Sequence, residues 1–496
     1  MLVKSFLGKK LARYVVSQTQ KWSQSPIKTQ EKVFWHLLKT AKNTAFGKDH
    51  HFAEIKNYED FKARVPVRDY EGLKSYIERI QKGEKDVLWK GRPVSFAKTS
   101  GTTSGAKYIP LTKASLEHQI SAAKNALLHY IEDSGNYHFV NGKMIFLQGS
   151  PELNTDSIIP VGRLSGIVAN YVPSYLQSNR LPSYETNCIE DWEQKVEAII
   201  DETLPQDMRL ISGIPSWVQM YFERLHKRTG KKISEVFPNF SLFVFGGVNY
   251  EPYRKKFEEL IGKKVDSLEL YPASEGFIAF QDKQEEKGLL LLLDYGIFYE
   301  FIPTEEYFDE NPTRISLKEV ELGVNYVIIL NTNAGLWGYN IGDTVQFTCV
   351  EPYRIVVSGR IKHFTSAFGE HVIGKEVDEA MRVTLQRFSN VEVTEFTVAP
   401  QVEPHEGLPY HEWLVEFANA PEDLAEFSQL LDAHLQSQNV YYKDLIEGKV
   451  LRSLVLNPLP KDAFYHFMKS QGKLGGQNKV PRLSNDRKMA DGLLSL

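Results

Sequence analysis

Apolar and polar positions follow two different rhythms along the 496 residues of the chain. Up to about residue 90, apolar side chains recur at helical spacing, which predicts a mostly helical segment. From about residue 91 to 350, short β-rich runs alternate with helical stretches, as in an α/β sheet. The expected strands are Lys143–Leu147, Met208–Ile211, Leu242–Phe245, Ser267–Leu270 and Tyr326–Leu330. The expected helices are Leu116–Ile131, Trp192–Glu202, Pro215–Lys227 and Pro252–Ile261.

Most of the expected strands end at a polar or glycine-rich turn. These turns are Gln148–Ser150, Ser212–Pro215, Gly246–Gly247 and Pro272–Glu275. Ligands of open α/β sheets bind beyond such strand ends, so we expect a binding site along this edge. Between Glu285 and Val320 we expect an antiparallel meander that includes Gly288–Leu293 and Phe298–Pro303.

The chain is too long for a single hydrophobic core, so at least two domains are expected. The segment Gly359–Lys362 is expected to open the second domain. Helical runs near Lys375–Phe388 and Glu422–Asn439 and a β-like run at Leu414–Phe417 follow it. The predicted fold is α/β. A large N-terminal domain (1–358) holds mixed or parallel sheets flanked by helices, and a smaller, mobile α+β domain (359–496) follows a hinge near 360–362.

The segment Phe96–Pro110 is unusually rich in small hydroxylated residues and glycine. Small residues let the backbone approach an anion and turn its N–H groups inward. Hydroxyl groups around Ser100–Ser104 add hydrogen-bond donors, and Lys107 adds a positive charge suited to a polyphosphate. A polar surface turn would have the same composition. The segment is not a Walker loop, because the Gly-Lys-Ser/Thr ending is missing.

Two further motifs follow in order, Tyr271–Gly276 and Tyr339–Asp343. Together the three motifs resemble those of the adenylate-forming superfamily, which includes acyl-CoA synthetases, luciferases and peptide-synthetase adenylation domains. Asn43–Lys48, Val65–Tyr70 and Gly83-Glu84 resemble a narrower branch, the auxin-responsive acyl-acid amido synthetases, in a bacterial-type form. The resemblance runs from about residue 30 to the C-terminus. It implies a ligase that adenylates a small carboxylic acid with ATP and Mg²⁺ and transfers the acyl group to an amino acid.

The resemblance also implies roles for single residues, beginning with the nucleotide. Tyr271 would stack on adenine, Ser274 would contact phosphate or carboxylate, and Asp343 would accept hydrogen bonds from the ribose hydroxyls. Glu275 would bind magnesium, which takes few protein carboxylates beside phosphate oxygens and water. The remaining nucleotide-binding candidates are Ser100, Gly101, Thr102, Thr103, Gly246, Gly247, Arg360 and Lys362, the last being the hinge pivot.

Two lysines are the catalytic candidates under this resemblance. Lys107 lies in the phosphate segment, and Lys479 would stabilise the charge that develops on the α-phosphate and carboxylate. Candidates for the acyl-acid pocket are Trp217, Tyr171 and Tyr175, although core packing would equally explain aromatic residues there. The family usually has arginines immediately before and after the tyrosine of the third motif, where this chain has Gly338 and Asn340.

Composition excludes several other classes of protein. The net charge of −4 gives no basic surface for nucleic acid. Two distant cysteines, Cys188 and Cys349, argue against a disulfide framework and suit a reducing cytosol. The longest apolar run, Leu289–Leu293, is too short to cross a bilayer, and the N-terminus lacks a signal-peptide core. We therefore expect a cytoplasmic enzyme with no membrane partner, and the sequence leaves its oligomeric state open.

Two alternatives stay open at this stage. An acyl-CoA synthetase would use the same adenylate with a thiol in place of the amine. A non-catalytic interaction protein that binds nucleotide would explain the missing arginines at positions 338 and 340. Magnesium-dependent AMP formation separates an enzyme from a binding protein, and dependence on an amino acid or on coenzyme A separates the two ligases.

Overall fold

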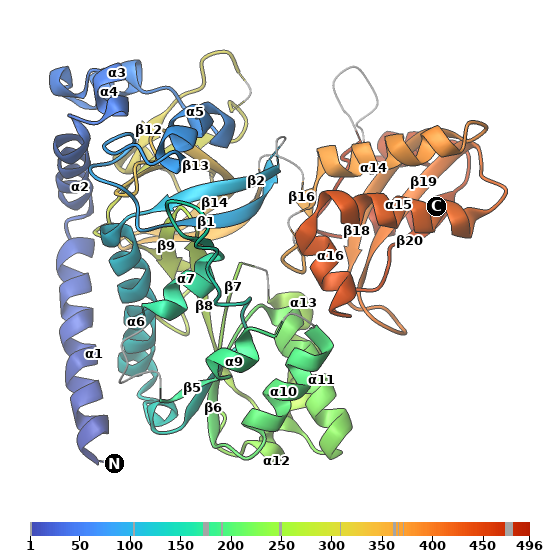
Figure 1. Cartoon of the computed structure of the whole chain (residues 1–496), viewed down its shortest axis with the longest axis horizontal. Helices are drawn as coiled ribbons and strands as arrows, with labels where there is room; N and C mark the ends of the chain where they lie inside the picture. Colours follow the sequence, from blue (N-terminus) through green and yellow to red (C-terminus); the bar gives the residue numbers. More distant parts are fainter. Residues whose placement is uncertain are drawn as a thin grey trace.

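The computed structural model describes residues 2–102, 105–171, 178–189, 192–247, 250–307, 309–360, 364–365, 367–370, 372–471 and 480–496. The first ninety residues are mostly helical, as predicted, and the long helix α1 (Leu2–Ser23) lies along α6 (Lys113–Ser134) (Figure 1). Asn57 and Asp69 cap two of the helices, because their side chains accept hydrogen bonds from backbone N–H groups of the first turn. The elements are α1 (Leu2–Ser23), α2 (Pro26–Ala41), α3 (Ala45–Asp49), η1 (Phe52–Glu54), α4 (Tyr58–Arg64) and α5 (Tyr70–Gln81).

A mixed twelve-stranded sheet, in the order β12-β11-β13-β14-β15-β10-β9-β8-β7-β6-β3-β5, forms the centre of the large domain. Strands β5, β3, β6, β7 and β8 are parallel, and from β8 to β12 the pairing is antiparallel. Their bounds are β3 (Lys143–Phe146), β5 (Arg180–Leu181), β6 (Met208–Ser212), β7 (Leu242–Gly246), β8 (Asp266–Ala273), β9 (Gly276–Phe280), β10 (Leu289–Leu291), β11 (Ile297–Pro303), β12 (Ile315–Ser316), β13 (Asn325–Thr332), β14 (Tyr339–Val350) and β15 (Tyr353–Arg360).

The five strands predicted in this region are confirmed, but the predicted meander is wrong. Strands β10 and β11 exist, yet they do not pair with each other. Strand β10 pairs with β9 and β15, whereas β11 pairs with β12 and β13. The chain leaves β10 through a turn at Gly296, where φ is +71°, and the place beside β10 is taken by β15, which comes much later in the sequence. Local alternation predicted the strands but not these long-range partners.

The predicted helices are also confirmed, and they cover the sheet. Helix α6 packs on β8 and β9, and α11 packs between α10 and α13. A smaller sheet, β2-β1-β4, lies beside this layer. These elements are β1 (Ser95–Thr102), β2 (Gly105–Leu111), η2 (His138–Asn141), β4 (Val161–Gly162), α7 (Leu164–Asn170), α9 (Tyr184–Asn187), α10 (Trp192–Thr203), α11 (Pro215–Thr229), α12 (Ile233–Val236), α13 (Glu251–Ile261) and η3 (Leu317–Glu319).

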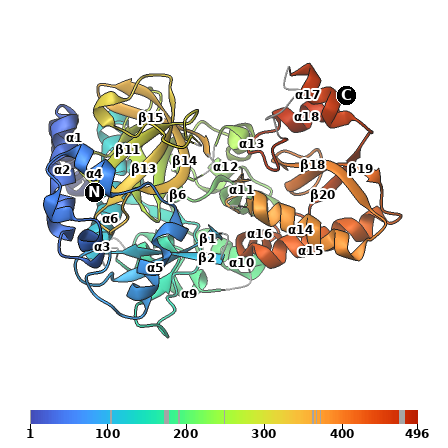
Figure 2. The same ribbon diagram turned by 90° about the horizontal axis from the view of Figure 1, so that it is seen from above.

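The C-terminal elements form a smaller α+β domain that lies to one side of the large domain in both views (Figures 1 and 2). Its three-stranded sheet has the order β18-β19-β20, and its helices follow the predicted runs closely. The elements are β16 (Phe364–Thr365), β17 (Val372–Ile373), α14 (Gly374–Arg387), β18 (Glu392–Gln401), β19 (Tyr410–Asn419), α15 (Leu424–Gln438), α16 (Val440–Glu447), β20 (Val455–Leu459), α17 (Ala463–Ser470) and α18 (Lys488–Leu494). The predicted fold class is confirmed. Within the described part of the chain, no helix has the length and apolar character that a membrane span requires.

Candidate active site

The second and third motifs meet through a buried hydrogen bond. The hydroxyl of Tyr271, on β8, donates to Oδ2 of Asp343, on β14, at 2.5 Å. Both residues are buried, at 7% and 6% exposure. In the sheet order four strand spacings separate β8 from β14, about 19 Å in a flat sheet. The sheet must therefore curl strongly here, and the curl brings the two motifs together.

A second contact joins the same two motifs. Ser274 and Glu275 form the half-buried turn between β8 and β9. Burial raises the pKa of the Tyr339 hydroxyl well above its usual range, and the negative charges of Glu275 and Asp69 raise it further. Glu275 therefore lies close to Tyr339, while Tyr271 contacts Asp343. Each motif supplies one tyrosine and one carboxylate, and each tyrosine faces the carboxylate of the other motif.

The residues in place of the family arginines support the backbone. Gly338 has φ of +56°, and a Cβ atom there would lie 2.6 Å from the carbonyl oxygen of Pro66. No arginine fits this position without moving the chain. Asn340 is buried, and its Oδ1 accepts a hydrogen bond of 2.6 Å from the N–H of Gly342 while its Nδ2 donates to the Tyr307 hydroxyl. Both residues are thus explained by the path of the chain before Asp343.

The predicted phosphate segment is the end of a β-hairpin made by β1 and β2. Lys107 is half-buried on β2, where it pairs with Thr99. The backbone of Ser100, Gly101 and Thr102 continues β1, and Thr103 lies outside the described residues. The hairpin is fixed from the N-terminal side, because the N–H of Tyr108 donates to the Tyr70 hydroxyl at 3.0 Å.

The segment Val65–Tyr70 links this hairpin to β14. The N–H of Arg68 donates to the carbonyl of Gly338, and the carbonyl of Arg68 accepts from the N–H of Asn340, both at 2.9 Å. The two residues after Arg68 are Asp69, whose charge raises the pKa of Tyr339, and Tyr70, whose hydroxyl contacts the hairpin. Sequence reasoning used this segment only as a family signature. Its role in connecting two motifs had no signal in the local pattern.

The other candidates lie in different settings. Gly246 ends β7, and a Cβ there would lie 2.4 Å from the carbonyl oxygen of Leu270, just before Tyr271. Gly247 has φ of +78°.

Trp217 is half-buried in the first turn of α11, and Tyr171, at the end of α7, is 45% exposed. The backbone of Arg360 ends β15 opposite Asp343. Lys362, Lys479 and Tyr175 lie outside the described residues.

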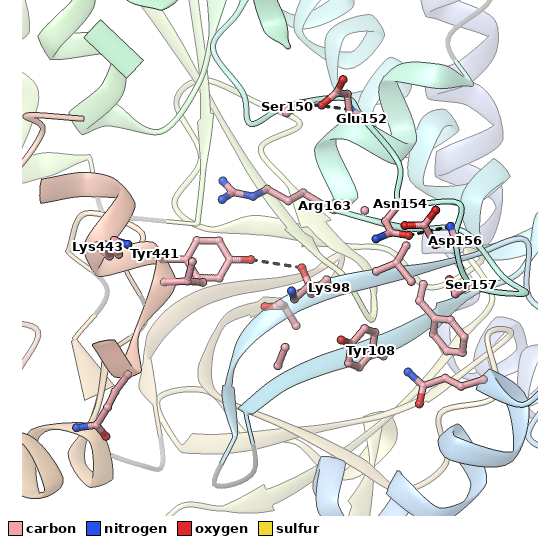
Figure 3. Close-up of a pocket in the computed structure, with 18 of the residues that line it drawn as sticks. Lys98, Tyr108, Ser150, Glu152, Asn154, Asp156, Ser157, Arg163, Tyr441 and Lys443 are labelled. Atoms are coloured by element: carbon pink, nitrogen blue, oxygen red, sulfur yellow. Dashed lines mark hydrogen bonds between the residues drawn. The ribbon is translucent and has the colours of Figure 1, made fainter. Parts of the chain in front are cut away.

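A cavity of about 1460 Å³ lies between the hairpin, the segment 150–163 and helices α14 to α16. Figure 3 shows that Tyr441 reaches from α16 toward β1, where its hydroxyl donates to the carbonyl of Lys98 at 3.3 Å. Arg163 extends into the same space. Trp217 and Tyr171 are not among the described residues that line it. Sequence reasoning missed Arg163 and Tyr441, because no motif marks them.

The described residues contain no group of three or more histidine, cysteine, aspartate or glutamate side chains arranged around a metal position. Cys188 and Cys349 are half-buried free thiols. Glu275 lies near the Tyr339 hydroxyl, and Asp343 accepts a hydrogen bond from Tyr271, so the two carboxylates do not share one metal position. A single carboxylate such as Glu275 would suit Mg²⁺ held mainly by phosphate oxygens rather than a metal held by the protein alone.

Comparison with protein families matches three models along this chain. The GH3 family N-terminal domain matches residues 15–181 and 164–265, the GH3 family central domain matches residues 290–360, and the GH3 family C-terminal domain matches residues 375–488.

Two plant enzymes are among the similar proteins. A jasmonoyl–L-amino acid synthetase of Nicotiana attenuata is 23% identical over 352 residues, which cover 58% of this chain and 60% of the relative. An indole-3-acetic acid-amido synthetase of Arabidopsis thaliana is 21% identical over 97% of this chain and 94% of the relative. These relatives leave the expectation of a bacterial-type member untested.

Two solved structures share the fold. The acyl acid amido synthetase AtGH3.15, in complex with 2,4-DB, has a TM-score of 0.62 and 17% identity, covering 98% of this chain and 96% of that one. A 2-hydroxyisobutyryl-CoA ligase in complex with 2-HIB-AMP and CoA has a TM-score of 0.58 and 14% identity, covering 95% and 93%. The two-domain architecture is therefore shared over nearly the whole chain.

Proposed function

Because the chain belongs to the GH3 family, we propose that it is an ATP-dependent ligase that joins a small carboxylic acid to the amino group of an amino acid through an acyl-adenylate. The observation that carries this proposal is the junction of the two motifs. Tyr271 contacts Asp343 and Glu275 faces Tyr339, beside the hairpin that holds Lys107. This junction provides carboxylates for a nucleoside and a metal next to a loop of small residues suited to phosphate.

In the first half-reaction a carboxylate oxygen of the acid attacks the α-phosphorus of ATP. A new bond forms between that oxygen and the phosphorus, the bond from the α-phosphorus to the bridging oxygen breaks, and pyrophosphate leaves with the electron pair. Ser100, Gly101, Thr102 and Thr103 would hold the β- and γ-phosphates by backbone and hydroxyl donors. Lys107, on the same hairpin, would neutralise part of their charge.

Glu275 is the proposed protein ligand of magnesium. Its carboxylate lies at the turn after β8, and its charge and that of Asp69 both raise the pKa of Tyr339. Carboxylate oxygen at this point fits a hard cation. Magnesium neutralises phosphate charge when it is bound. Ser274, the neighbour of Glu275, would contact the phosphate or the substrate carboxylate.

Asp343 would accept hydrogen bonds from the two ribose hydroxyls. The Tyr271 hydroxyl holds one oxygen of this carboxylate, so Tyr271 orients Asp343 in addition to its proposed stacking on adenine. Gly246 and Gly247 would let the backbone approach the adenine edge, and the close packing of Gly246 on Leu270 supports a tight strand end there.

In the second half-reaction the neutral amine attacks the acyl carbon. The carbon–nitrogen bond forms, the bond from the acyl carbon to the phosphate oxygen breaks, AMP leaves with the electron pair, and the amine proton passes to solvent. Lys479 would stabilise the charge on the α-phosphate and carboxylate in the first step. Arg360 and Lys362 would act at the hinge. The end of β15 at Arg360, and the end of the central-domain match at residue 360, support a domain boundary there.

The acid pocket is proposed from Trp217, Tyr171 and Tyr175, of which Tyr175 lies outside the described residues. An acyl-CoA synthetase remains the alternative, since a CoA ligase shares the fold. Membership of the GH3 family favours the amide-forming reaction. A binding protein without catalysis loses its main support, because Gly338 and Asn340 have backbone roles of their own.

The test is pyrophosphate release from MgATP with a panel of acids that includes jasmonate, indole-3-acetate and 2,4-DB, with and without pooled amino acids. We expect release to require one of the acids, to rise with amino acids, and to disappear in Glu275→Ala. ATP binding without release for any acid would favour the binding protein. Stimulation by coenzyme A instead of amino acids would favour the thioester ligase.

A further inference from the structure

One guanidinium group reaches into the cavity between the two domains. Arg163 directly follows β4, which pairs with β1 in parallel through Phe96↔Val161 and Ala97↔Gly162. The last pair in this register, Ala97↔Gly162, lies three residues before Ser100 on β1, and Arg163 is the residue after Gly162. At the rise of an extended strand three residues span about 10 Å, so the backbone of Arg163 lies within roughly that distance of the proposed phosphate-binding loop.

The stem of Arg163 is held by close packing on a glycine. A Cβ atom at Gly149 would lie 2.9 Å from Cδ of Arg163. Lys195 is a second cation nearby. It is 2% exposed and donates to the carbonyl of Asn187 at 2.6 Å. Burial lowers the pKa of Lys195 to about 8, and the positive charge of Arg163 contributes to this shift. Arg163 thus has a second basic group, Lys195, close enough for their charges to interact.

The partner of Arg163 comes from the other domain. Nη2 of Arg163 donates to Oδ2 of Asp444, on α16, at 2.6 Å. The guanidinium lies 5.0 Å from the ring centre of Tyr441, and Figure 3 shows both of these side chains. Asp444 and Tyr441 are three residues apart and therefore share one helix face. The side chains of Arg163 and Asp444 are 37% and 43% exposed. A half-exposed pair of this kind contributes little to stability, so a competing carboxylate can displace Asp444.

We propose that Arg163 binds the α-carboxylate of the acceptor amino acid, and that Asp444 occupies this position when no acceptor is bound. This inference rests on the proposed function. A guanidinium fork matches a carboxylate, and the acceptor carries its carboxylate one carbon away from the reacting amine. A carboxylate subsite must therefore lie within a few ångströms of the acyl-adenylate, as the position of Arg163 beside the hairpin allows. The subsite selects amino acids over simple amines.

The test compares Arg163→Gln and Asp444→Asn in the full-length enzyme with an acid that supports pyrophosphate release. Amide formation is followed against amino acid concentration, and hydroxylamine serves as a nucleophile that lacks a carboxylate. Arg163→Gln is expected to raise KM for the amino acid roughly 10- to 100-fold. Asp444→Asn is expected to lower it about two- to fivefold, because the competitor is lost. The preference for an amino acid over its amide should shrink only in Arg163→Gln.

Arg228→Gln is the matched control. Arg228 also forms a half-exposed ion pair with an aspartate, Asp201, on helices α11 and α10 outside the cavity. This variant should keep the wild-type KM and preference.

Three results would overturn the proposal. An equal rise in KM in both Arg163→Gln and Asp444→Asn would make the pair a simple contact between domains. An unchanged KM in Arg163→Gln would exclude carboxylate binding. A loss of pyrophosphate release in Arg163→Gln, with a higher KM for the acid, would assign Arg163 to the acyl substrate. Absence of release with every acid in the wild-type protein is a separate result, which overturns the proposed function itself.

Discussion

The Tyr271 hydroxyl and the Asp343 carboxylate are 72 positions apart in the sequence and 2.5 Å apart in the structure. Because both are buried, the carboxylate depends on this donor for part of its solvation. The bond fixes the orientation of Asp343 before any nucleotide binds. The two motifs are therefore one preorganised unit rather than two independent ligand contacts.

Tyr271→Phe should weaken both stability and nucleotide binding. Removal of one donor from a buried carboxylate costs about 1–3 kcal/mol of unfolding free energy. KM for ATP should rise as well, because Asp343 loses its orienting partner. Urea denaturation and steady-state kinetics measure the two effects. Tyr295→Phe, which also removes a largely buried hydroxyl, in this case the acceptor of Asn125, should lower stability without a change in KM. Equal KM values in the two variants would contradict the orienting role.

Gly338→Ala should destabilise the protein more than a glycine replacement that adds strain alone. A left-handed residue other than glycine costs about 1–2 kcal/mol, and the new Cβ would also clash with the carbonyl oxygen of Pro66. Gly323→Ala is the control, because Gly323 has φ of +81° with no atom within 4 Å of the added Cβ. In thermal or urea unfolding, the wild type should be the most stable, Gly323→Ala intermediate and Gly338→Ala the least stable. If the two glycine variants were equal, the close approach would not explain the missing arginine.

Glu300→Ala should weaken nucleotide binding through a buried polar network. Glu300 is fully buried and accepts hydrogen bonds from Tyr58, Arg314 and Asn331, and Asn331 in turn accepts one from the N–H of Gly338. Loss of one partner of a buried ion pair costs about 3–5 kcal/mol. We expect Glu300→Ala to lower the free energy of unfolding by this amount and to raise KM for ATP.

Asp282→Ala is the matched control for Glu300→Ala. It breaks another buried ion pair, that of Asp282 with Arg354. This pair is not a member of the hydrogen-bonded chain from Glu300 through Asn331 to Gly338. A similar loss of stability with an unchanged KM is expected in urea titrations and ATP kinetics. If both variants raised KM equally, general loosening rather than the network would be responsible.

Lys195 should make stability depend on alkaline pH. Burial lowers its pKa to about 8 in the folded protein, against about 10.4 in an unfolded chain. Below pH 8 both states carry the proton, and the folded state bears the full cost of the buried charge. Between pH 8 and about 10.4 the unfolded state binds more protons, so stability rises with pH, by on the order of 3 kcal/mol in total.

The measurement is the difference in unfolding free energy between wild type and Lys195→Met at pH 7.5 and pH 10. Subtraction removes the tyrosines and other lysines that titrate in this range. The wild type should gain relative to the variant as pH rises. A constant difference would show that Lys195 titrates alike in both states.

The sequence predicted the elements whose signals are local and missed those that depend on distant partners. Helices such as α6 and α11 have apolar spacing and end at Gly135 and Gly230 in the left-handed conformation, so their existence is encoded locally. The pairing of β10 with β15 is not, because more than sixty residues lie between Leu290 and its partner Arg354. The same holds for the site. Motif composition indicated Tyr271, Glu275 and Asp343, but nothing near Arg163 in the sequence indicates a carboxylate delivered from α16.

The hydrogen bond from Tyr441 to the carbonyl of Lys98 couples the position of the small domain to the phosphate hairpin. Lys98 lies on the strand that continues into the proposed phosphate loop, so under the proposed function one strand would contact the nucleotide at its end and a helix of the other domain on its flank. Thermodynamic reciprocity then applies. By whatever factor docking of α16 alters nucleotide affinity, nucleotide binding must alter docking by the same factor. Release of pyrophosphate from the hairpin would thus itself shift the position of the small domain, without a separate sensor.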